Sequence, residues 1–337
     1  MRNRDDLTLG IDVGASNVRA AVIDPLGRIL GEDKHRLVSK EPPQVVEAVV
    51  RAAKTACGAA GIPFAEMRAL GLGVQGQIGK SNGMVLSAPG LGWRDVELQK
   101  LVQARAPKLF IKLSSDVAAA TWAERAAGAG KGADDLVVVL VGATVGAGIV
   151  LGGRLQEGVS GAAGDLGHVN VHPGGRACAC GHRGCLDAYA SAPSLAAWAR
   201  DDLRIASAAA KAVGKTPAVG RRLLEHADGD PDRINAAAME RAADAGDDLA
   251  IHLLDEASRL LGLAVANLVT ALNPSRLLLG GTLLASSPRM RRGTQQSVAQ
   301  HASRSALAVL EVATPALGEE AAIIGAALMA AEAAANA

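Results

Sequence analysis

The first third of the chain alternates short apolar runs with turns of small residues. Residues 7–13 and 18–24 are apolar runs on either side of the turn Gly14–Asn17, which predicts an opening β-hairpin. Residues 42–61 follow with helical spacing and end in glycine, and residues 69–76 predict a further buried strand. This order of elements is typical of an α/β domain.

The same order recurs in the second half. Two apolar runs, residues 136–142 and 149–155, enclose the small-residue turn 143–148. Helical spacing then dominates from Pro193 to Asn273 and is followed by a strand at 275–281. Two related α/β halves are therefore expected.

We place the domain boundary before the helix that starts near Asp116. The expected N-terminal α/β domain covers residues 1–115 and is completed by a C-terminal helix at 318–337, and the second α/β domain covers 116–317. The longest uncharged run, residues 136–153, contains five glycines and is expected to form a buried hairpin, not a membrane span.

Composition excludes several function classes. Hydrophobic residues make up 49% of the chain, enough for one large core or two modest ones, and 35 Lys and Arg nearly balance 34 Asp and Glu. This balance gives no reason to expect nucleic acid or an anionic membrane as a partner. The N-terminus lacks the apolar stretch of a signal peptide, so we expect a cytoplasmic protein.

The two small-residue turns are candidate phosphate sites. Small side chains let the backbone approach a phosphate, Ser16 offers a hydroxyl, and Asp12 could orient a Mg²⁺ ion. Glycine hairpins are also common structural features, but equivalent turns in two similar halves suggest that a nucleotide's phosphates lie between them. The candidate residues from these turns are Asp12, Gly14, Ser16, Asn17, Gly142, Ala143 and Thr144.

A strand end at Ser115 and Asp116 is a second candidate position. It could present a carboxylate to a ligand, although on local sequence either residue could simply cap the following helix.

Three of the four cysteines, Cys178, Cys180 and Cys185, lie within eight residues. Three thiolates and a histidine would form a closed tetrahedral zinc site, whereas the alternative is three reduced thiols without metal. Spacing alone leaves His168, His172 and His182 open as the fourth ligand. The flanking carboxylates Asp165 and Asp187 either accept hydrogen bonds from a polyol or serve as ordinary loop and capping residues. Cys57 stands alone and is expected to be a buried thiol.

The sequence resembles the ROK family of bacterial sugar kinases and sugar-responsive repressors from about Leu7 to Ala330. The most specific segment is AGDLGHVNVHPGGRACACGHRGCLDAYAS, which resembles the family's combined sugar and zinc segment. GIDVGASNVRAAVID resembles its first phosphate motif. SAPGLGW, SSDVAAA, NPSRLLLGG and LGEEAAIIGAA fall in the expected order.

The resemblance implies an actin-like (ribonuclease H-like) two-domain fold with an interdomain cleft and ATP-dependent phosphorylation of a hexose, with glucose the leading substrate and the 6-hydroxyl the expected acceptor. It implies ATP, Mg²⁺ and structural Zn²⁺, and a homodimer or dimer of dimers. Asp116 matches the catalytic base, Gly280 and Gly281 match a turn beside the adenosine, and the zinc loop covers residues 164–187. The implied sugar contacts are Ser115, Asp165, His168 and Asp187, and the implied zinc ligands are His168, Cys178, Cys180 and Cys185.

Several positions depart from the family pattern. Ser115 stands where Asn is usual, and Asp165 and Asp187 stand where Glu is usual. The second turn is GATVG where GTGxG is usual, and Gly90 replaces a common Asn. An N-acyl or amino hexose kinase is therefore an alternative, as is a catalytically weak sugar sensor. A DNA-binding repressor is not expected, because only a few residues precede Leu7.

Overall fold

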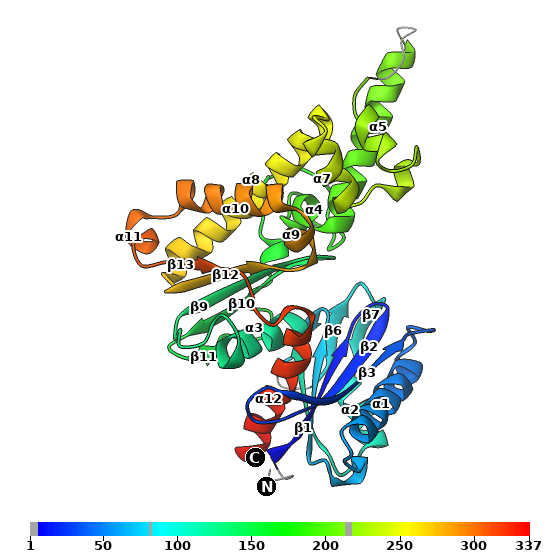
Figure 1. The fold of residues 1–337 in the computed structure, drawn as a ribbon, viewed down its shortest axis with the longest axis vertical. Helices are drawn as coiled ribbons and strands as arrows, with labels where there is room; N and C mark the ends of the chain where they lie inside the picture. The colour runs from blue at the N-terminus through cyan, green and yellow to red at the C-terminus, as the bar shows by residue number, and fades with distance from the viewer. Residues whose placement is uncertain (1–5, 81–82, 213–217) are drawn as a thin grey trace. The chain divides into compact units, whose positions relative to one another are not determined.

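A computed structural model describes residues 6–80, 83–212 and 218–337 (Figure 1). The chain divides into two compact units. The first contains residues 1–137, 148–164 and 314–337, and the second contains 138–147 and 165–313. The helix that begins at Asp116 belongs to the first unit, whereas the sequence-based division assigned it to the second. The domain boundaries expected from sequence stay a prediction.

The first unit is built on a five-stranded mixed sheet in the order β3-β2-β1-β4-β8. The predicted opening hairpin is confirmed, because β1 and β2 pair antiparallel, as do β2 and β3. Strand β4 pairs parallel with both β1 and β8. The strands are β1 (Thr8–Val13), β2 (Asn17–Ile23), β3 (Ile29–Arg36), β4 (Ala69–Val74) and β8 (Phe110–Ser115).

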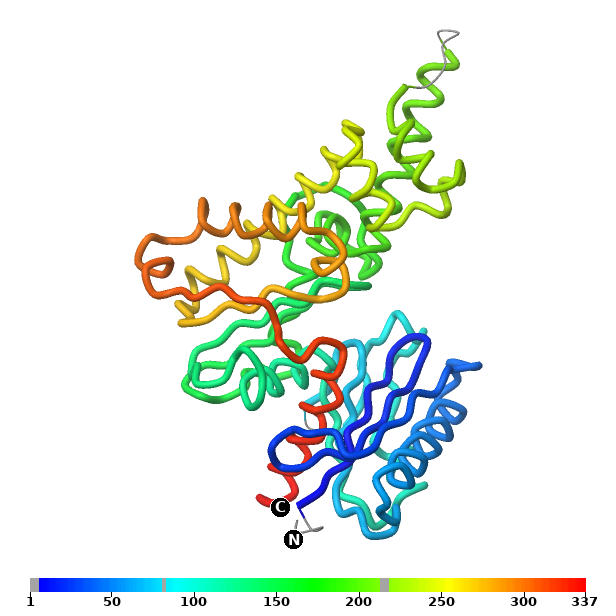
Figure 2. Tube along the Cα trace, in the orientation of Figure 1, coloured from blue at the N-terminus to red at the C-terminus, as the bar shows by residue number. Residues whose placement is uncertain are grey.

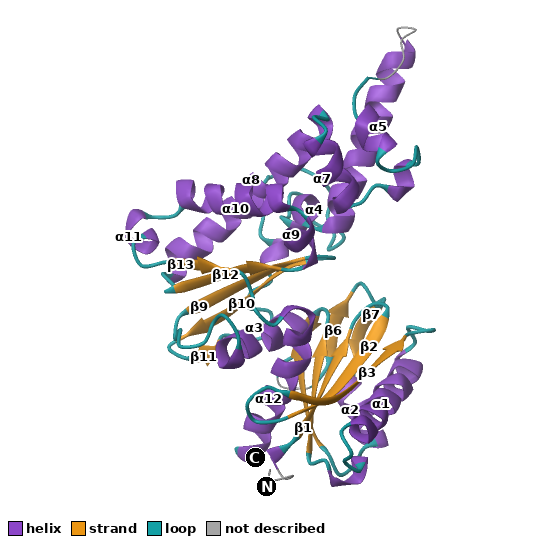
Figure 3. Cartoon of the chain, viewed as in Figure 1, coloured by secondary structure: helices purple, strands orange, loops and turns teal. Residues whose placement is uncertain are grey.

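Helices cover both faces of this sheet (Figure 3). Helix α1 (Pro42–Ala59) packs on β2 and β3, and α12 (Ala321–Ala335) packs on β1 and β4 on the opposite face. Two strand glycines make the close approach of α12 possible: a Cβ at Gly10 would overlap the carbonyl oxygen of Ile323, and one at Gly71 that of Ala326. Helix α3 (Asp116–Ala127) packs on α12 in turn.

A small antiparallel sheet and a further helix also belong to the first unit. Its strands pair in the order β5-β6-β7. The Trp93 indole N–H donates to the Lys40 carbonyl at 2.6 Å, and the Lys40 ammonium donates to the Gly90 carbonyl at 2.8 Å, so the loop that contains Gly90 is held in place. The elements are β5 (Gln77–Ile78), β6 (Val85–Ala88), β7 (Trp93–Val96), the 3₁₀ turn η2 (Phe64–Glu66) and α2 (Leu98–Arg105).

A second five-stranded sheet has the order β11-β10-β9-β12-β13. Strand β9 matches the first predicted apolar run and β12 matches the strand predicted at 275–281. Strand β10, however, begins at Val145, inside the predicted turn 143–148, and the predicted run 149–155 covers the end of β10, a glycine turn and β11. The similar arrangement of the two sheets agrees with the two α/β halves expected from sequence. The strands are β9 (Leu136–Val141), β10 (Val145–Leu151), β11 (Arg154–Leu155), β12 (Arg276–Gly280) and β13 (Glu311–Ala313).

The second unit is rich in helices, as the spacing from Pro193 to Asn273 predicted; residues 213–217 of that stretch lie outside the described residues. The longest is α8 (Asp248–Leu272), which starts where the Asp247 carboxylate accepts from the Ala250 N–H and ends at Asn273 in the left-handed region, with φ 48°. Of the helices described, none combines the length and apolarity needed to cross a membrane. The Cα trace can be followed in Figure 2. The remaining helices are η3 (Leu166–His168), α4 (Asp187–Ala190), α5 (Ala192–Ala212), α6 (Arg221–Glu225), η4 (Pro231–Arg233), α7 (Ala236–Asp244), α9 (Thr282–Ser286), α10 (Pro288–His301) and α11 (Arg304–Leu307), and η5 (Gly318–Glu320) precedes α12 in the first unit.

Candidate active site and metal cluster

Asp116 stands at the first position of α3, directly after β8. The preceding residue, Ser115, is the N-cap, and its hydroxyl oxygen accepts from the Ala118 N–H at 3.1 Å. Asp116 accepts from the Val117 N–H through Oδ1 at 2.8 Å. Ser115 therefore caps α3, a role that the sequence left open for both residues. The second carboxylate oxygen of Asp116, Oδ2, has no part in that cap.

The electrostatic surroundings of Asp116 favour its protonated form. The pKa of Asp116 is raised to about 7, mainly by burial; the negative charge of Asp12 contributes to this rise, and the hydrogen bond from Val117 opposes it. A carboxyl with a pKa near the working pH is suited to accept and release a proton. The geometry thus allows Asp116 to act as a general base.

Asp12 lies on β1 in register with Arg19 of β2. The pKa of Asp12 is raised to about 6, mainly by burial, with a smaller contribution from the Glu319 carboxylate and with the Arg19 guanidinium opposing the rise. The first unit therefore places two carboxylates of raised pKa, from β1 and α3, within reach of each other's charge. Perturbed carboxyl groups in this arrangement are typical of functional sites.

The first small-residue turn joins β1 to β2 with exposed polar groups. The Gly14 N–H donates to the Asn17 carbonyl at 3.0 Å, and the Ser16 carbonyl accepts from the Leu37 N–H at 2.8 Å. A Cβ at Gly14 would meet the Asn17 oxygen at 3.5 Å, an ordinary contact, so packing within the protein does not require glycine there. The Ser16 residue is exposed. A turn of this kind leaves room for a phosphate group to approach its backbone.

The second small-residue turn meets the turn after β12. A Cβ at Gly281, where φ is 96°, would overlap the backbone of Val141, and a Cβ at Gly142 would lie 2.9 Å from the Thr282 hydroxyl. The Gly142 N–H donates to the Thr144 carbonyl at 3.0 Å. The second unit thus brings together the candidates Gly142, Ala143, Thr144, Gly280 and Gly281. Sequence reasoning missed Thr282, the first residue of α9, although it directly follows the Gly280-Gly281 pair.

The three predicted sugar contacts of the second unit are neighbours. Asp187 begins α4, and its Oδ1 accepts from the Val145 N–H at 2.9 Å. Burial raises the pKa of Asp187; the Val145 bond and the charge of His168 oppose this, and the charge of Asp165 adds to it. The Asp165 carbonyl accepts from the His168 N–H at 3.1 Å. The Asp187 side chain thus lies close to Asp165 and His168, and it is hydrogen-bonded to Val145 beside the second small-residue turn.

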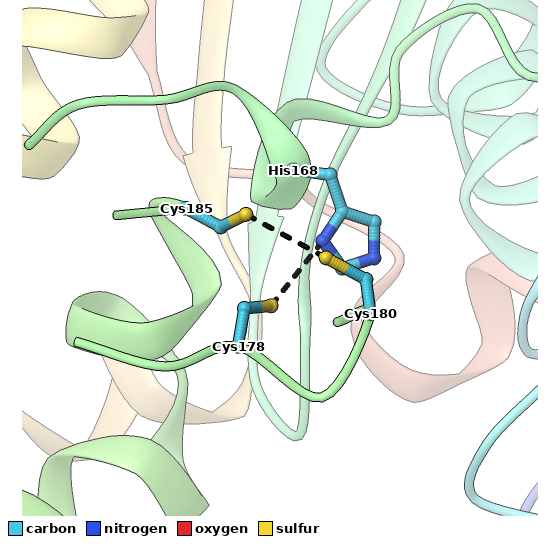
Figure 4. A group of neighbouring side chains, drawn as sticks. All are labelled: His168, Cys178, Cys180 and Cys185. Atoms are coloured by element: carbon cyan, nitrogen blue, oxygen red, sulfur yellow. Dashed lines mark hydrogen bonds between the residues drawn. The ribbon is translucent and has the colours of Figure 1, made fainter. Parts of the chain in front are cut away.

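His168, Cys178, Cys180 and Cys185 converge in the loop between η3 and α4 (Figure 4). Their ligand atoms all lie within 4.8 Å of one another. The His168 Nδ1 is 3.7 Å from the Cys178 Sγ, and the sulfurs of Cys180 and Cys185 are 3.6 Å apart. Tetrahedral zinc with ordinary bond lengths requires about 3.6 Å between nitrogen and sulfur and about 3.8 Å between two sulfurs. The four side chains therefore fit a zinc ion.

The structure distinguishes the three histidines that spacing left open. His182 contacts Cys180, with Nδ1 3.5 Å from Sγ, but does not belong to the four-residue group, and His172 stacks on Tyr189 with ring centroids 5.8 Å apart. Burial opposes ionisation of Cys180, but hydrogen bonds from the His182 backbone and ring and from Cys178 and Cys185 together outweigh it and lower the pKa of that thiol to about 6. This favours the thiolate, the form that binds metal.

Tyr189, the single tyrosine of the chain, anchors the loop that contains the cluster. Its hydroxyl accepts from the Arg176 N–H at 2.7 Å, and its ring meets Trp198 edge to face with centroids 5.4 Å apart. Sequence reasoning missed this role, although Tyr189 lies two residues after Asp187. Cys57, in contrast, is buried on α1 as expected, and burial raises the pKa of its thiol to about 11.

Comparisons with known proteins show which family the chain resembles over most of its length. The ROK family profile matches residues 8–333. A glucokinase of Streptomyces coelicolor is 32% identical over 277 residues, which cover 82% of each chain. The crystal structure of a ROK family glucokinase from Streptomyces griseus, in complex with glucose and AMPPNP, matches with a TM-score of 0.79 at 30% identity and covers 97% of this chain and 99% of that one. A ROK hexokinase structure from Thermus thermophilus matches with a TM-score of 0.77 at 28% identity, covering 98% and 100%.

The chain belongs to the ROK family. Its fold is the actin-like sugar kinase fold that the resemblance predicted, and the family prediction from sequence is confirmed.

Proposed function

We propose that the protein transfers the γ-phosphoryl group of ATP to a hexose, as a glucokinase-like sugar kinase. The observation that carries this proposal is Asp116, a carboxylate at a helix start with a pKa of about 7 and beside Asp12. Asp116 takes the proton of the sugar hydroxyl as that hydroxyl attacks the γ-phosphate, and the 6-hydroxyl of a glucose-like ring is the expected acceptor.

The two small-residue turns bind the nucleotide in this proposal. The backbone of Gly14 to Asn17 and that of Gly142 to Thr144 approach the phosphates, and Gly280 and Gly281 lie beside the adenosine. Asp12 orients Mg²⁺, which supplies charge neutralisation on the phosphates when bound. Asp12 itself is held at the end of β1, where Arg19 opposes its protonation.

Ser115, Asp165, His168 and Asp187 contact the sugar. A structural zinc held by His168, Cys178, Cys180 and Cys185 would fix the loop, so that His168 keeps its ring orientation beside Asp187. We expect a cytoplasmic protein that works as a homodimer or dimer of dimers, with ATP and the sugar as its ligands and no nucleic-acid partner.

A coupled assay of ADP release over a panel of hexoses tests this function. Glucose, mannose, glucosamine and N-acetylated hexoses should be compared at saturating ATP and Mg²⁺. Turnover with glucose as the preferred substrate is the expected result. Preference for an amino or N-acyl hexose would reassign the substrate within the kinase class. Sugar binding in calorimetry without turnover on any hexose would identify a sensor and contradict the kinase proposal.

A further inference from the structure

Residues Thr314–Glu320 form a short strap between β13 and α12. The chain passes from the second unit to the first at its start, between Ala313 and Thr314. Most of the strap is exposed: Pro315 and Leu317 are partly buried and the other five residues are exposed. A segment with so little buried apolar surface takes its position from its polar contacts.

One end of the strap is bound by a buried carboxylate on α3. Glu124 is 1% exposed and accepts from the Ala316 N–H through Oε2 at 3.1 Å and from the Leu317 N–H through Oε1 at 2.8 Å. Oε2 also accepts from the Ala129 N–H at 2.8 Å, directly after α3 ends. Both carboxylate oxygens are thus used to fix the strap to the helix that Asp116 begins.

The other end of the strap is bound by Arg19. The Arg19 Nη1 donates to the Glu319 carbonyl oxygen at 2.8 Å and lies 3.6 Å from the Glu319 carboxylate. Arg19 is in register with Asp12 across the β1–β2 pair, so the two side chains lie side by side on one face of the sheet. The Arg19 side chain is only 17% exposed, compared with 72% for Glu319.

A left-handed bend separates the two anchors. Gly318 has a φ of 55°, and a Cβ there would meet no atom within 4 Å. Glycine is therefore favoured at this position by the left-handed backbone conformation, and not by a lack of space for a side chain. The bend sets the direction of the chain between Leu317, held by Glu124, and Glu319, held by Arg19.

We propose that the strap couples the positions of the two carboxylates of the candidate phosphoryl-transfer site, Asp12 and Asp116. Arg19 is then a positioning residue for Asp12, and Glu124 is a positioning residue for Asp116. The strap is a polar link between β2, which places Arg19 beside Asp12, and α3, which begins with Asp116. It adds to the strand pairing β2-β1-β4-β8, which also connects the two elements. A rate that depends on the relative placement of two carboxylates falls steeply when either moves by about 1 Å. The inference rests on the proposed kinase function, because only that function assigns Asp12 and Asp116 to one reaction.

Kinetics of single and double variants test the coupling. Arg19→Met removes the donor, and Glu124→Gln replaces one acceptor oxygen with a donor that faces a backbone N–H. We expect each single variant to lower kcat roughly tenfold and to change the KM of the sugar less than about twofold. The double variant should be only about as slow as the slower single variant, because residues that act through one link are not additive. Gly318→Ala, which touches neither anchor, should also lower kcat.

Two matched controls separate coupling from lost stability. Glu240 is a nearly buried carboxylate of α7 that accepts from the Ser287 hydroxyl at 2.5 Å and from the Arg289 N–H at 2.8 Å, and Arg276 pairs with Glu311 at 2.7 Å. Glu240→Gln and Arg276→Met should lower Tm without lowering kcat. The proposal would be overturned if the kcat losses of the two single variants multiply in the Arg19 and Glu124 double variant. It would also be overturned if kcat is unchanged in both single variants.

Hydrogen exchange provides a readout that does not depend on turnover. Glu124→Gln should speed amide exchange in residues 12–19, and Glu240→Gln should not. If Glu124→Gln does not fold, Glu124→Asp and Gly318→Ala are measured in its place with the same expectations. A wild-type protein without turnover on any hexose contradicts the proposed function, whereas unchanged exchange in residues 12–19 contradicts the coupling itself.

Discussion

The Asp187 carboxylate accepts a hydrogen bond from the Val145 N–H at 2.9 Å, so a predicted sugar contact is bonded to the turn predicted to bind phosphate. One side chain thereby links α4 to the start of β10. Asp187 stands where Glu is usual in the family pattern, and it begins α4. The substitution at this position is therefore accompanied by a specific contact.

Asp187→Asn and Asp187→Ala should differ because of that contact. Asn keeps an oxygen that can accept from Val145, so we expect a higher KM for the sugar with little change in the KM for ATP. Ala removes both contacts and should raise both KM values, with kcat/KM lowered roughly 10- to 100-fold. Steady-state kinetics with each substrate varied in turn decides this. Equal KM values for ATP in the two variants would show that the Val145 bond does not affect nucleotide binding.

The metal cluster should hold about one zinc per chain in purified, untagged protein. Cys180→Ser should release the metal and speed proteolysis within residues 164–187, because binding energy at a structural site contributes to local folding. Cys57→Ala is the matched control, since Cys57 is buried on α1 outside the cluster. It should retain zinc in elemental analysis. Wild-type protein free of zinc after purification without chelators would contradict the prediction.

Asp116→Asn should lower turnover by roughly two to four orders of magnitude, the usual contribution of a general base. The fold should persist, because Asn keeps an oxygen that can accept from the Val117 N–H. Sugar affinity measured by calorimetry should change little. Near-wild-type turnover in this variant would restrict Asp116 to a structural role at the start of α3.

The same variant should be at least as stable as the wild type at neutral pH. The pKa of Asp116 is raised from 3.8 to about 7, so the folded protein binds more protons than the unfolded chain between about pH 4 and pH 7. The contribution of this group to stability therefore falls as pH rises through that window. Thermal unfolding at pH 8 should give an equal or higher Tm for Asp116→Asn, and the difference should shrink near pH 4. A lower Tm at pH 8 would contradict the assigned pKa.

The pH dependence of turnover follows from the same group. A base must be ionised before it accepts a proton, so kcat/KM should fall about tenfold per pH unit below about pH 7. Rates measured from pH 5 to pH 9 at saturating Mg²⁺ test this, with the coupling enzymes checked at each pH. A flat profile down to pH 5 would show that Asp116 is ionised far below the expected range.

Sequence predicted the elements whose signals are local. Apolar runs around Gly14–Asn17 and around the second small-residue turn are enough to predict that both hairpins exist, although β10 begins at Val145, inside the predicted turn 143–148. Helical spacing is enough to predict α1 and α8. The cysteine spacing similarly limited the metal ligands to three thiols and one of three histidines. The family resemblance implied His168 among the three. In the folded loop Asn170 and Cys185 form a bridge that brings η3 back to the cysteines.

Contacts between distant segments could not be predicted in this way. Nothing near Glu124 indicates that its carboxylate binds the backbone of Ala316 and Leu317, because a backbone N–H has no sequence signature. The hydroxyl of Thr282 lies beside Gly142 only because β12 and β9 are neighbours in the sheet. The family resemblance gave the candidate residues of the site, and the tertiary structure was needed to find the contacts that each of them makes.

The close packing of α12 on β1 and β4 has a consequence for biosynthesis. The ribosome releases β1, with Gly10, long before it releases Ile323, the residue whose carbonyl lies against that glycine. Until α12 emerges, one face of the first sheet lacks its covering helix, whereas every segment of the second unit has already been translated. The unit that begins the chain is therefore the last to be completed, because its covering helix α12 is the last element to be translated.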